Sequence, residues 1–191
     1  MQIEISSIEE LVEHQNFKSD TICQNHKDTH MNIFIVANET QDDENFDSSA
    51  KGEKPEEVYL LTSFNKNISV FLCHEKQYLY NLSIDNKEMA CSRQHKKMFF
   101  VGTFCDTLFM FIYDADSKKL VPGSEMRTHE SIISIAILTD EMILCGQSNG
   151  YVDTITCRPN KKYKGEWRMD NVASKFCSNL GYINCIQVCN R

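Results

Sequence analysis

The sequence has few glycines, prolines and tryptophans: seven, three and one among 191 residues. The glycines stand too far apart to form a Gly-rich phosphate-binding loop. A serine-centred nucleophile elbow, a metalloprotease helix and paired carboxylates in an apolar setting are also lacking. We therefore predict a protein that is not an enzyme, with no catalytic residues and no cofactor.

Long apolar runs are lacking too. No stretch reaches the roughly 20 apolar residues that a membrane-spanning helix needs. The first ten residues carry charges where a signal peptide would be apolar. We expect no membrane partner and an intracellular, cytoplasmic location.

Clusters of basic residues are likewise missing. The 20 Lys and Arg residues are spread along the chain in pairs such as Lys96-Lys97, against 27 Asp and Glu, and the formal net charge is −7. Nucleic-acid binding needs clustered positive charge that releases counterions from the phosphates. Nucleic acid is therefore not favoured as a partner.

Cysteine, in contrast, is abundant. With no secretory signal the thiols are expected to stay reduced, and most lie in apolar runs where Cys packs as a small hydrophobic residue. Cys91 and His95 lie in a turn region and could approach each other as nucleophile and base. A thiol- or redox-responsive protein using free cysteines is therefore an alternative function. The nine are Cys23, Cys73, Cys91, Cys105, Cys145, Cys157, Cys177, Cys185 and Cys189.

Short runs rich in Ile, Val, Phe, Tyr and Leu alternate with polar clusters from residue 31 onward. This pattern is typical of many short β-strands, and it predicts an all-β chain. The predicted strands are 31–38, 57–64, 68–74, 77–84, 87–93, 97–104, 107–114, 118–127, 131–138, 141–147, 151–157, 164–171 and 182–189.

The predicted strands repeat in groups of four. Around the second and third strands of each group the sequences are VYLLTSFNKNISVFL, MFFVGTFCDTLFMFI and MILCGQSNGYVDTIT. Thr62, Gly102 and Gly146 occupy the same place, 40 and 44 residues apart. Self-similarity of this kind indicates a repeat architecture.

This unit resembles the WD-repeat family of β-propellers, in which each blade is a four-stranded antiparallel sheet. The best match has His129 ahead of one strand, an apolar second strand ending near Gly146, and an Asn149-Gly150 turn. The resemblance implies about three blades with degenerate repeats, plus an extra strand at 182–189. It covers roughly residues 31–189.

The expected organisation is a lead-in segment over 1–30 with a possible short helix, followed by a partial propeller over 31–191. An acidic loop is inserted at about 40–56, and residues 41–57 hold seven acidic and two basic residues. Because a propeller ring usually has four to eight blades, three do not close it. The chain is then part of a longer protein, a fragment that needs a partner chain, or an oligomer.

The resemblance implies a scaffold for a protein or peptide partner. In the family, partners meet the loops between second and third strands and those leading into the first strand. By position, the partner-binding residues would be Asn65, Thr103, Phe104, His129, Glu130, Gln147 and Ser148.

A possible zinc site is the one metal motif in the sequence. His14, Cys23, His26 and His30 supply ligand types of such a site. Structural zinc sites usually have two paired half-sites and one is present here, so we predict no metal and keep a zinc-dependent module as an alternative.

Overall fold

The computed structural model describes residues 30–36, 57–64, 66–73, 77–161, 166–178 and 181–188. Of residues 30–35, 57 and 64 it describes the backbone alone. The predicted lead-in over 1–29, the acidic insertion at about 40–56, Asn65 and three of the four candidate zinc ligands (His14, Cys23 and His26) lie outside the described residues.

Twelve strands account for the regular structure of the described residues, and each overlaps a predicted strand. The last differs most: it was predicted over 164–171 and lies over 167–176. They are β1 (His30–Val36), β2 (Glu57–Phe64), β3 (Asn67–Leu72), β4 (Gln77–Ser83), β5 (Met89–His95), β6 (Met98–Thr103), β7 (Thr107–Asp114), β8 (Lys119–Arg127), β9 (Ile132–Thr139), β10 (Met142–Gln147), β11 (Tyr151–Pro159) and β12 (Trp167–Phe176).

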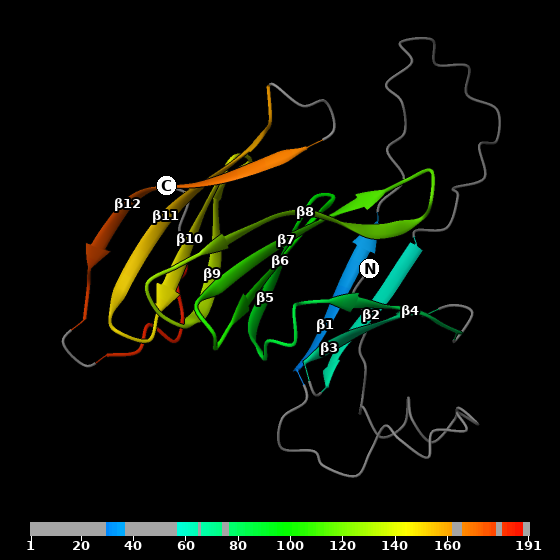
Figure 1. Ribbon diagram of the computed structural model, residues 1–191, viewed down its shortest axis with the longest axis horizontal. Coiled ribbons are helices and arrows are strands. Elements are labelled where there is room, and N and C mark those ends of the chain that lie inside the picture. Colours follow the sequence, from blue (N-terminus) through cyan, green and yellow to red (C-terminus); the bar gives the residue numbers. More distant parts are fainter. Residues whose placement is uncertain are drawn as a thin grey trace, which may run out of the picture.

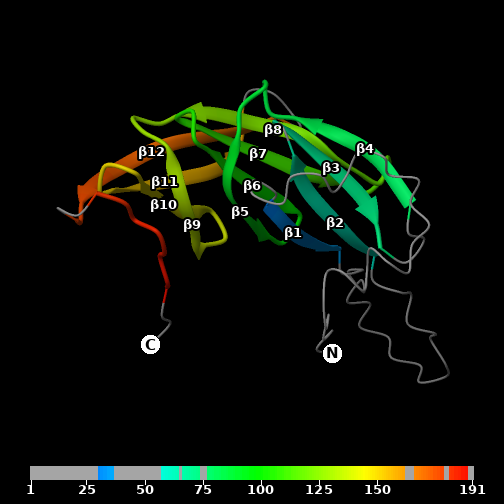
Figure 2. The same ribbon diagram turned by 90° about the horizontal axis from the view of Figure 1, so that it is seen from below.

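The strands form three four-stranded sheets in which consecutive strands are neighbours: β1 to β4, β5 to β8 and β9 to β12. All pairs are antiparallel. We call them the first, middle and third sheets. They follow one another in space as in sequence (Figure 1), and from below they form an arch (Figure 2). The predicted fold class, an all-β chain of propeller-type blades, is confirmed.

A residue with a positive φ angle recurs in the turn between the second and third strands of each sheet. Lys66, Asp106 and Gly150 adopt positive φ angles of 70°, 58° and 86°. They lie 40 and 44 residues apart, which is the spacing of the sequence repeat. A left-handed residue in a tight turn fits the twist of the flanking strands, so one local conformation recurs in three sheets.

The two inner strands of the middle sheet are buried on both faces. All six residues of β6 are buried, as are most of β7. Alternate residues point to opposite faces: Phe99 and Val101 belong to a core shared with the first sheet, and Met98 and Phe100 to a core shared with the third. Two covered faces explain why the sequences MFFVGT and TLFMFIYD are apolar without alternation.

The flanking sheets each bury one principal face, as their alternating burial patterns show. Leu61 and Val70 of the first sheet and Ile143 and Ile155 of the third sheet pack towards the middle sheet. Each fully buried side chain of this size contributes about 1.5–3 kcal/mol to folding. The three sheets are therefore held together chiefly by apolar side chains.

Three tyrosines take part in polar contacts between the first and middle sheets. The hydroxyls of Tyr59 and Tyr113 lie 3.2 Å apart in the buried core. The hydroxyl of Tyr80 accepts a hydrogen bond of 2.7 Å from the N–H of Leu120. Such directional contacts fix how one sheet lies on the next, because they are satisfied in one alignment.

The middle and third sheets meet closely at Gly102. A Cβ atom there would lie 2.7 Å from Cγ2 of Ile132 and 2.8 Å from Sγ of Cys91. The Cys91 thiol also donates a hydrogen bond of 3.4 Å to the carbonyl of Ile132. The absent side chain of Gly102 thus makes room for the first residue of β9.

The extra strand predicted over 182–189 is not formed in its described part, because residues 182–188 have no regular structure. The segment nevertheless contacts the third sheet: the N–H of Ile183 donates to the carbonyl of Gln147 at 3.2 Å. A β-strand requires a neighbouring strand to satisfy its backbone, and no described strand pairs with this segment.

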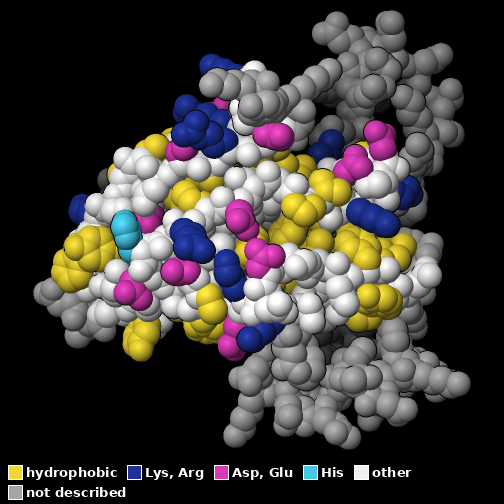
Figure 3. Space-filling model, viewed as in Figure 1, with side chains coloured by type: hydrophobic (Ala, Val, Ile, Leu, Met, Phe, Trp, Pro, Cys, Tyr) yellow, Lys and Arg dark blue, Asp and Glu magenta, His cyan; other side chains and the backbone are white. Residues whose placement is uncertain are grey.

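The surface carries mixed charge. On the face shown in Figure 3, Lys and Arg side chains are interspersed with Asp and Glu, and hydrophobic side chains lie in several separate patches. None of the described residues belongs to a helix long and apolar enough to cross a membrane.

We expect Gly102→Ala to lower the free energy of unfolding by about 1–3 kcal/mol, because Ile132 or Cys91 must move to admit the new methyl group. Denaturant unfolding of the purified chain measures the loss. In the double variant Gly102→Ala/Ile132→Ala the loss should be smaller than the sum of the two single losses. Additive losses would show that the two side chains do not compete for space.

Candidate functional site

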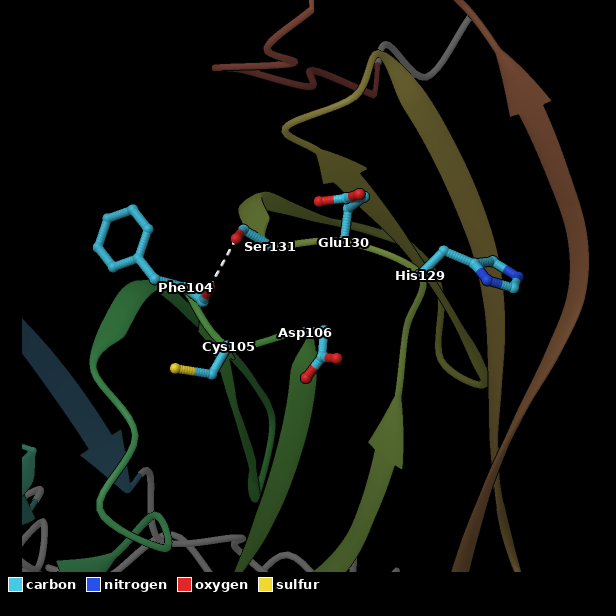
Figure 4. A pocket seen from close by; sticks show the side chains of 6 residues that line it. All are labelled: Phe104, Cys105, Asp106, His129, Glu130 and Ser131. Carbon is cyan, nitrogen blue, oxygen red and sulfur yellow. Dashed lines mark hydrogen bonds between the residues drawn. The ribbon is translucent and has the colours of Figure 1, made fainter.

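A shallow, open depression lies where the middle and third sheets meet. It is formed by the β6–β7 turn and by the segment that leads into β9. The residues lining it are Phe104, Cys105, Asp106, His129, Glu130 and Ser131. In Figure 4 the side chain of Phe104 lies at one end of the depression, and that of His129 extends away from it at the other end.

Hydrogen bonds between the two segments hold the depression in shape. The hydroxyl of Ser131 donates to the carbonyl of Phe104 at 2.6 Å (Figure 4). The N–H of Thr128 donates to the carbonyl of Asp106 at 2.8 Å. The first bond joins the segment that leads into the third sheet to a turn of the middle sheet. The second extends the β7–β8 pairing within the middle sheet. The shape of the depression therefore depends in part on how the two sheets are packed.

Thr103 organises the β6–β7 turn from inside. Its hydroxyl accepts hydrogen bonds from the N–H groups of Thr107, at 3.2 Å, and Cys105, at 3.3 Å, and donates to the carbonyl of Thr107 at 3.0 Å. Thr103 is completely buried. Its satisfied hydroxyl fixes the turn that presents Phe104 to solvent.

The predicted partner-binding residues differ in their exposure. Phe104, His129 and Glu130 are exposed and line the same depression. Ser148 is half-buried in the β10–β11 turn. The side chains of Thr103 and Gln147 are completely buried and do not reach a surface that a partner could contact, so the prediction is wrong for these two.

Sequence reasoning missed a buried polar cluster in the third sheet. Asp153 is completely buried, and its two carboxylate oxygens accept hydrogen bonds from the Gln147 amide and the Ser174 hydroxyl, the latter at 2.5 Å. Asp153 in the apolar strand YVDTITC could have indicated this cluster, because a buried carboxylate requires hydrogen-bond donors nearby.

The register shows why this cluster is specific to the third sheet. Asp153 lies opposite Cys145, and in the middle sheet Phe109 lies opposite Val101 in the equivalent pair. A polar residue therefore replaces an aromatic one at a core position. Asp153 bonds to both β10 and β12, so it ties the outer strand of this sheet to its interior.

Cys91 and His95 do not form the predicted nucleophile and base pair. They occupy one strand, four positions apart, and Cys91 donates to the carbonyl of Ile132. His95 lies 3.0 Å from Asp140 instead, and Lys96 lies 2.7 Å from the same carboxylate. Hydrogen bonds from Lys96 and His95 hold the pKa of Asp140 below its usual range.

Burial makes four thiols poorly reactive. Desolvation raises the pKa of Cys91 and Cys157 to about 12 and raises the pKa of Cys73 above its ordinary value. It also raises the pKa of Cys145, helped by nearby Cys91 and Asp153. The thiolate, which is the nucleophile and metal ligand, is disfavoured at all four. Exposed thiols among the described residues are Cys105, Cys177 and Cys185.

Metal-ligating side chains do not gather in groups of three or more within the described residues. The candidate zinc ligands His14, Cys23 and His26 are outside that part of the chain. Of His30, at the start of β1, the backbone alone is described.

No family model matches this sequence, and a search of curated proteins finds no match. Among solved structures, one match is Hsv2 of Kluyveromyces lactis, with a TM-score of 0.48 and 16% sequence identity. The match covers 61% of this chain and 43% of that chain, so this chain spans less than half the length of that structure.

We expect Asp153→Asn to destabilise the third sheet by about 1–3 kcal/mol, because an amide in place of the carboxylate turns one acceptor into a donor facing another donor. Asp170→Asn is the matched control, since Asp170 pairs with Arg168 on the surface of β12 and such pairs contribute little. Thermal or denaturant unfolding compares the two. Equal losses would contradict a structural role for the buried cluster.

Differential alkylation tests the thiols. At pH 8 the thiolate fraction of Cys91 and Cys157 is about one in ten thousand for a pKa of about 12. Iodoacetamide should therefore modify Cys105, Cys177 and Cys185 in the native chain. It should modify Cys91 and Cys157 only after denaturation, as read by peptide mass spectrometry. Labelling of Cys91 as fast as Cys105 would show that the β5–β9 contact opens readily.

Proposed function

We propose that this chain is a non-catalytic protein-interaction scaffold of the propeller type, and that it binds a protein or peptide segment at the depression between the middle and third sheets. One observation carries the proposal. The β6–β7 turn, 104–106, and the segment that leads into β9, 129–131, are joined by the hydrogen bond from Ser131 to Phe104 and present exposed side chains on one depression.

The chemistry of the depression suggests the partner. Phe104 is 45% exposed although it is a large aromatic residue, and such residues are common anchors of protein interfaces. The carboxylates of Asp106 and Glu130 line the same depression. A segment that carries Lys or Arg next to an apolar side chain would complement both features.

The shape of the depression also favours a peptide over a small molecule. Small-molecule sites are concave and bury most of their ligand, and this depression is shallow and open. The turn that presents Phe104 is fixed by the buried Thr103 hydroxyl and by the left-handed Asp106. A fixed turn loses little conformational entropy on binding, which favours affinity.

The arrangement of the polar side chains supports a non-catalytic role. Nucleophilic catalysis requires a base within hydrogen-bonding reach of the nucleophile. Within the described residues no hydrogen bond joins Cys105 to His129, and in Figure 4 their side chains extend in different directions. Binding therefore accounts for these exposed residues better than catalysis does.

A phage-displayed peptide library selected on the folded chain tests this function. We expect the selected peptides to be enriched in Lys or Arg beside Leu, Ile or Phe. Phe104→Ala should weaken their binding about tenfold or more. Asp106→Asn retains a residue tolerant of positive φ but removes a charge. It should therefore reduce peptide affinity more at low salt than at high salt.

Tyr78→Ala is the matched control. Tyr78 is 48% exposed and lies at the start of β4, at the end of its sheet opposite the β2–β3 turn. Its replacement should change peptide affinity less than about twofold, as surface residues outside an interface do. Peptides that bind wild type and Phe104→Ala with equal affinity would refute the proposed site.

A further inference from the structure

The described C-terminal segment, 181–188, repeats contacts that join the middle and third sheets. At that junction Ile132, the first residue of β9, lies over Gly102. Ile183 lies over Gly146 in the same way: a Cβ at Gly146 would be 2.5 Å from Cγ2 of Ile183. Gly102 and Gly146 are equivalent by register, opposite Leu108 and Val152.

The hydrogen bonding repeats as well. Opposite Gly102 is Cys91, whose thiol donates to the carbonyl of Ile132 at 3.4 Å. Opposite Gly146 is Ser134, whose hydroxyl donates to the carbonyl of Ile183 at 2.6 Å. Ile183 therefore lies on the third sheet as the first residue of β9 lies on the middle sheet.

The next residues extend the equivalence. Ile132 is followed two positions later by Ser134, and Ile183 is followed two positions later by Cys185. Among the described residues, 184–188 make no backbone–backbone hydrogen bond. Asn184 and Cys185 are exposed. In an antiparallel pair alternate residues bond to the neighbouring strand, so one of these two residues has its N–H and C=O at the place where β9 bonds to β10.

We infer that residues 182–188 are a docking edge to which an antiparallel β-strand, lying outside residues 1–188 of this chain, adds as β10 adds to β9. The incoming strand is extended and apolar and has Gly or another small residue opposite Cys185, because Gly102 and Gly146 hold that place in the two preceding sheets. Backbone hydrogen bonds supply the recognition, as in other cases of strand addition. This inference does not depend on the depression at Phe104.

The edge is uncharged. Residues 181–188 contain no Asp, Glu, Lys or Arg. Binding there should be nearly independent of ionic strength, unlike binding beside Asp106 and Glu130. Ionic strength therefore separates the two interactions.

A fluorescent peptide copying residues 140–149 of this chain, with Cys145→Ser, is the probe, because it contains β10, the strand that pairs with β9. Fluorescence anisotropy should show saturable binding that changes less than about twofold between low and high salt. Hydrogen exchange should show new protection of amides within 183–188. A scrambled peptide should not bind.

Proline substitution tests the backbone bonding. Consecutive N–H groups of a strand point to opposite edges, so either Asn184→Pro or Cys185→Pro should weaken binding at least tenfold, while Asn184→Ala and Cys185→Ala change it less than twofold. Circular dichroism checks that the variants fold. Phe104→Ala should bind the peptide as wild type does, whatever its effect at the depression.

Three outcomes would overturn the inference. The first is the absence of saturable binding together with unchanged exchange in wild-type chain. The second is equal affinity for the scrambled peptide, or equal effects of proline and alanine at both positions. The third is a concentration-dependent dimer of the unliganded chain with 183–188 protected, which would make a second copy the occupant.

Discussion

The rest of this structure depends on the burial of the middle sheet between its two neighbours. Phe99 and Val101 pack against the first sheet, and Phe100 and Met110 pack against the third. The two inner strands of this sheet, β6 and β7, are covered on both faces, so their contacts define how the two flanking sheets are oriented. Each flanking sheet has one principal covered face, and it depends on the middle sheet for that cover.

The surface features follow from this packing. The depression exists because the turn carrying Phe104 belongs to the middle sheet, whereas Ser131, which bonds to it, leads into the third. Glycine at 102 allows the approach of the two sheets that brings these segments together. The contact of Ile132 with Gly102 and the depression at Phe104 thus both arise where the middle and third sheets meet. The same kind of contact recurs where Ile183 lies over Gly146.

Much of the fold could be predicted from the sequence because strand formation depends mainly on the local pattern of apolar and turn residues. Apolar runs bounded by turn residues predicted all twelve strands, and the 40- and 44-residue spacing aligned the turns at Lys66, Asp106 and Gly150. The candidate site was predicted less well. Thr103 and Gln147 are polar residues next to turns, and their hydroxyl and amide bond inward to Thr107 and Asp153. Local sequence does not show which way such a side chain points.

The sequence by itself determined the strands, their grouping in fours and the repeating turns, since these depend on side-chain alternation and on residues tolerant of positive φ. The tertiary structure alone decided which residues reach solvent. It placed the Cys91 thiol against the carbonyl of Ile132, so that Cys91 does not pair with His95. It left Phe104, Asp106 and Glu130 on one surface. It also left residues 182–188 without a pairing strand among the described strands. Burial and strand pairing depend on segments that come together from distant parts of the chain. The sequence of one strand does not specify which segments these are.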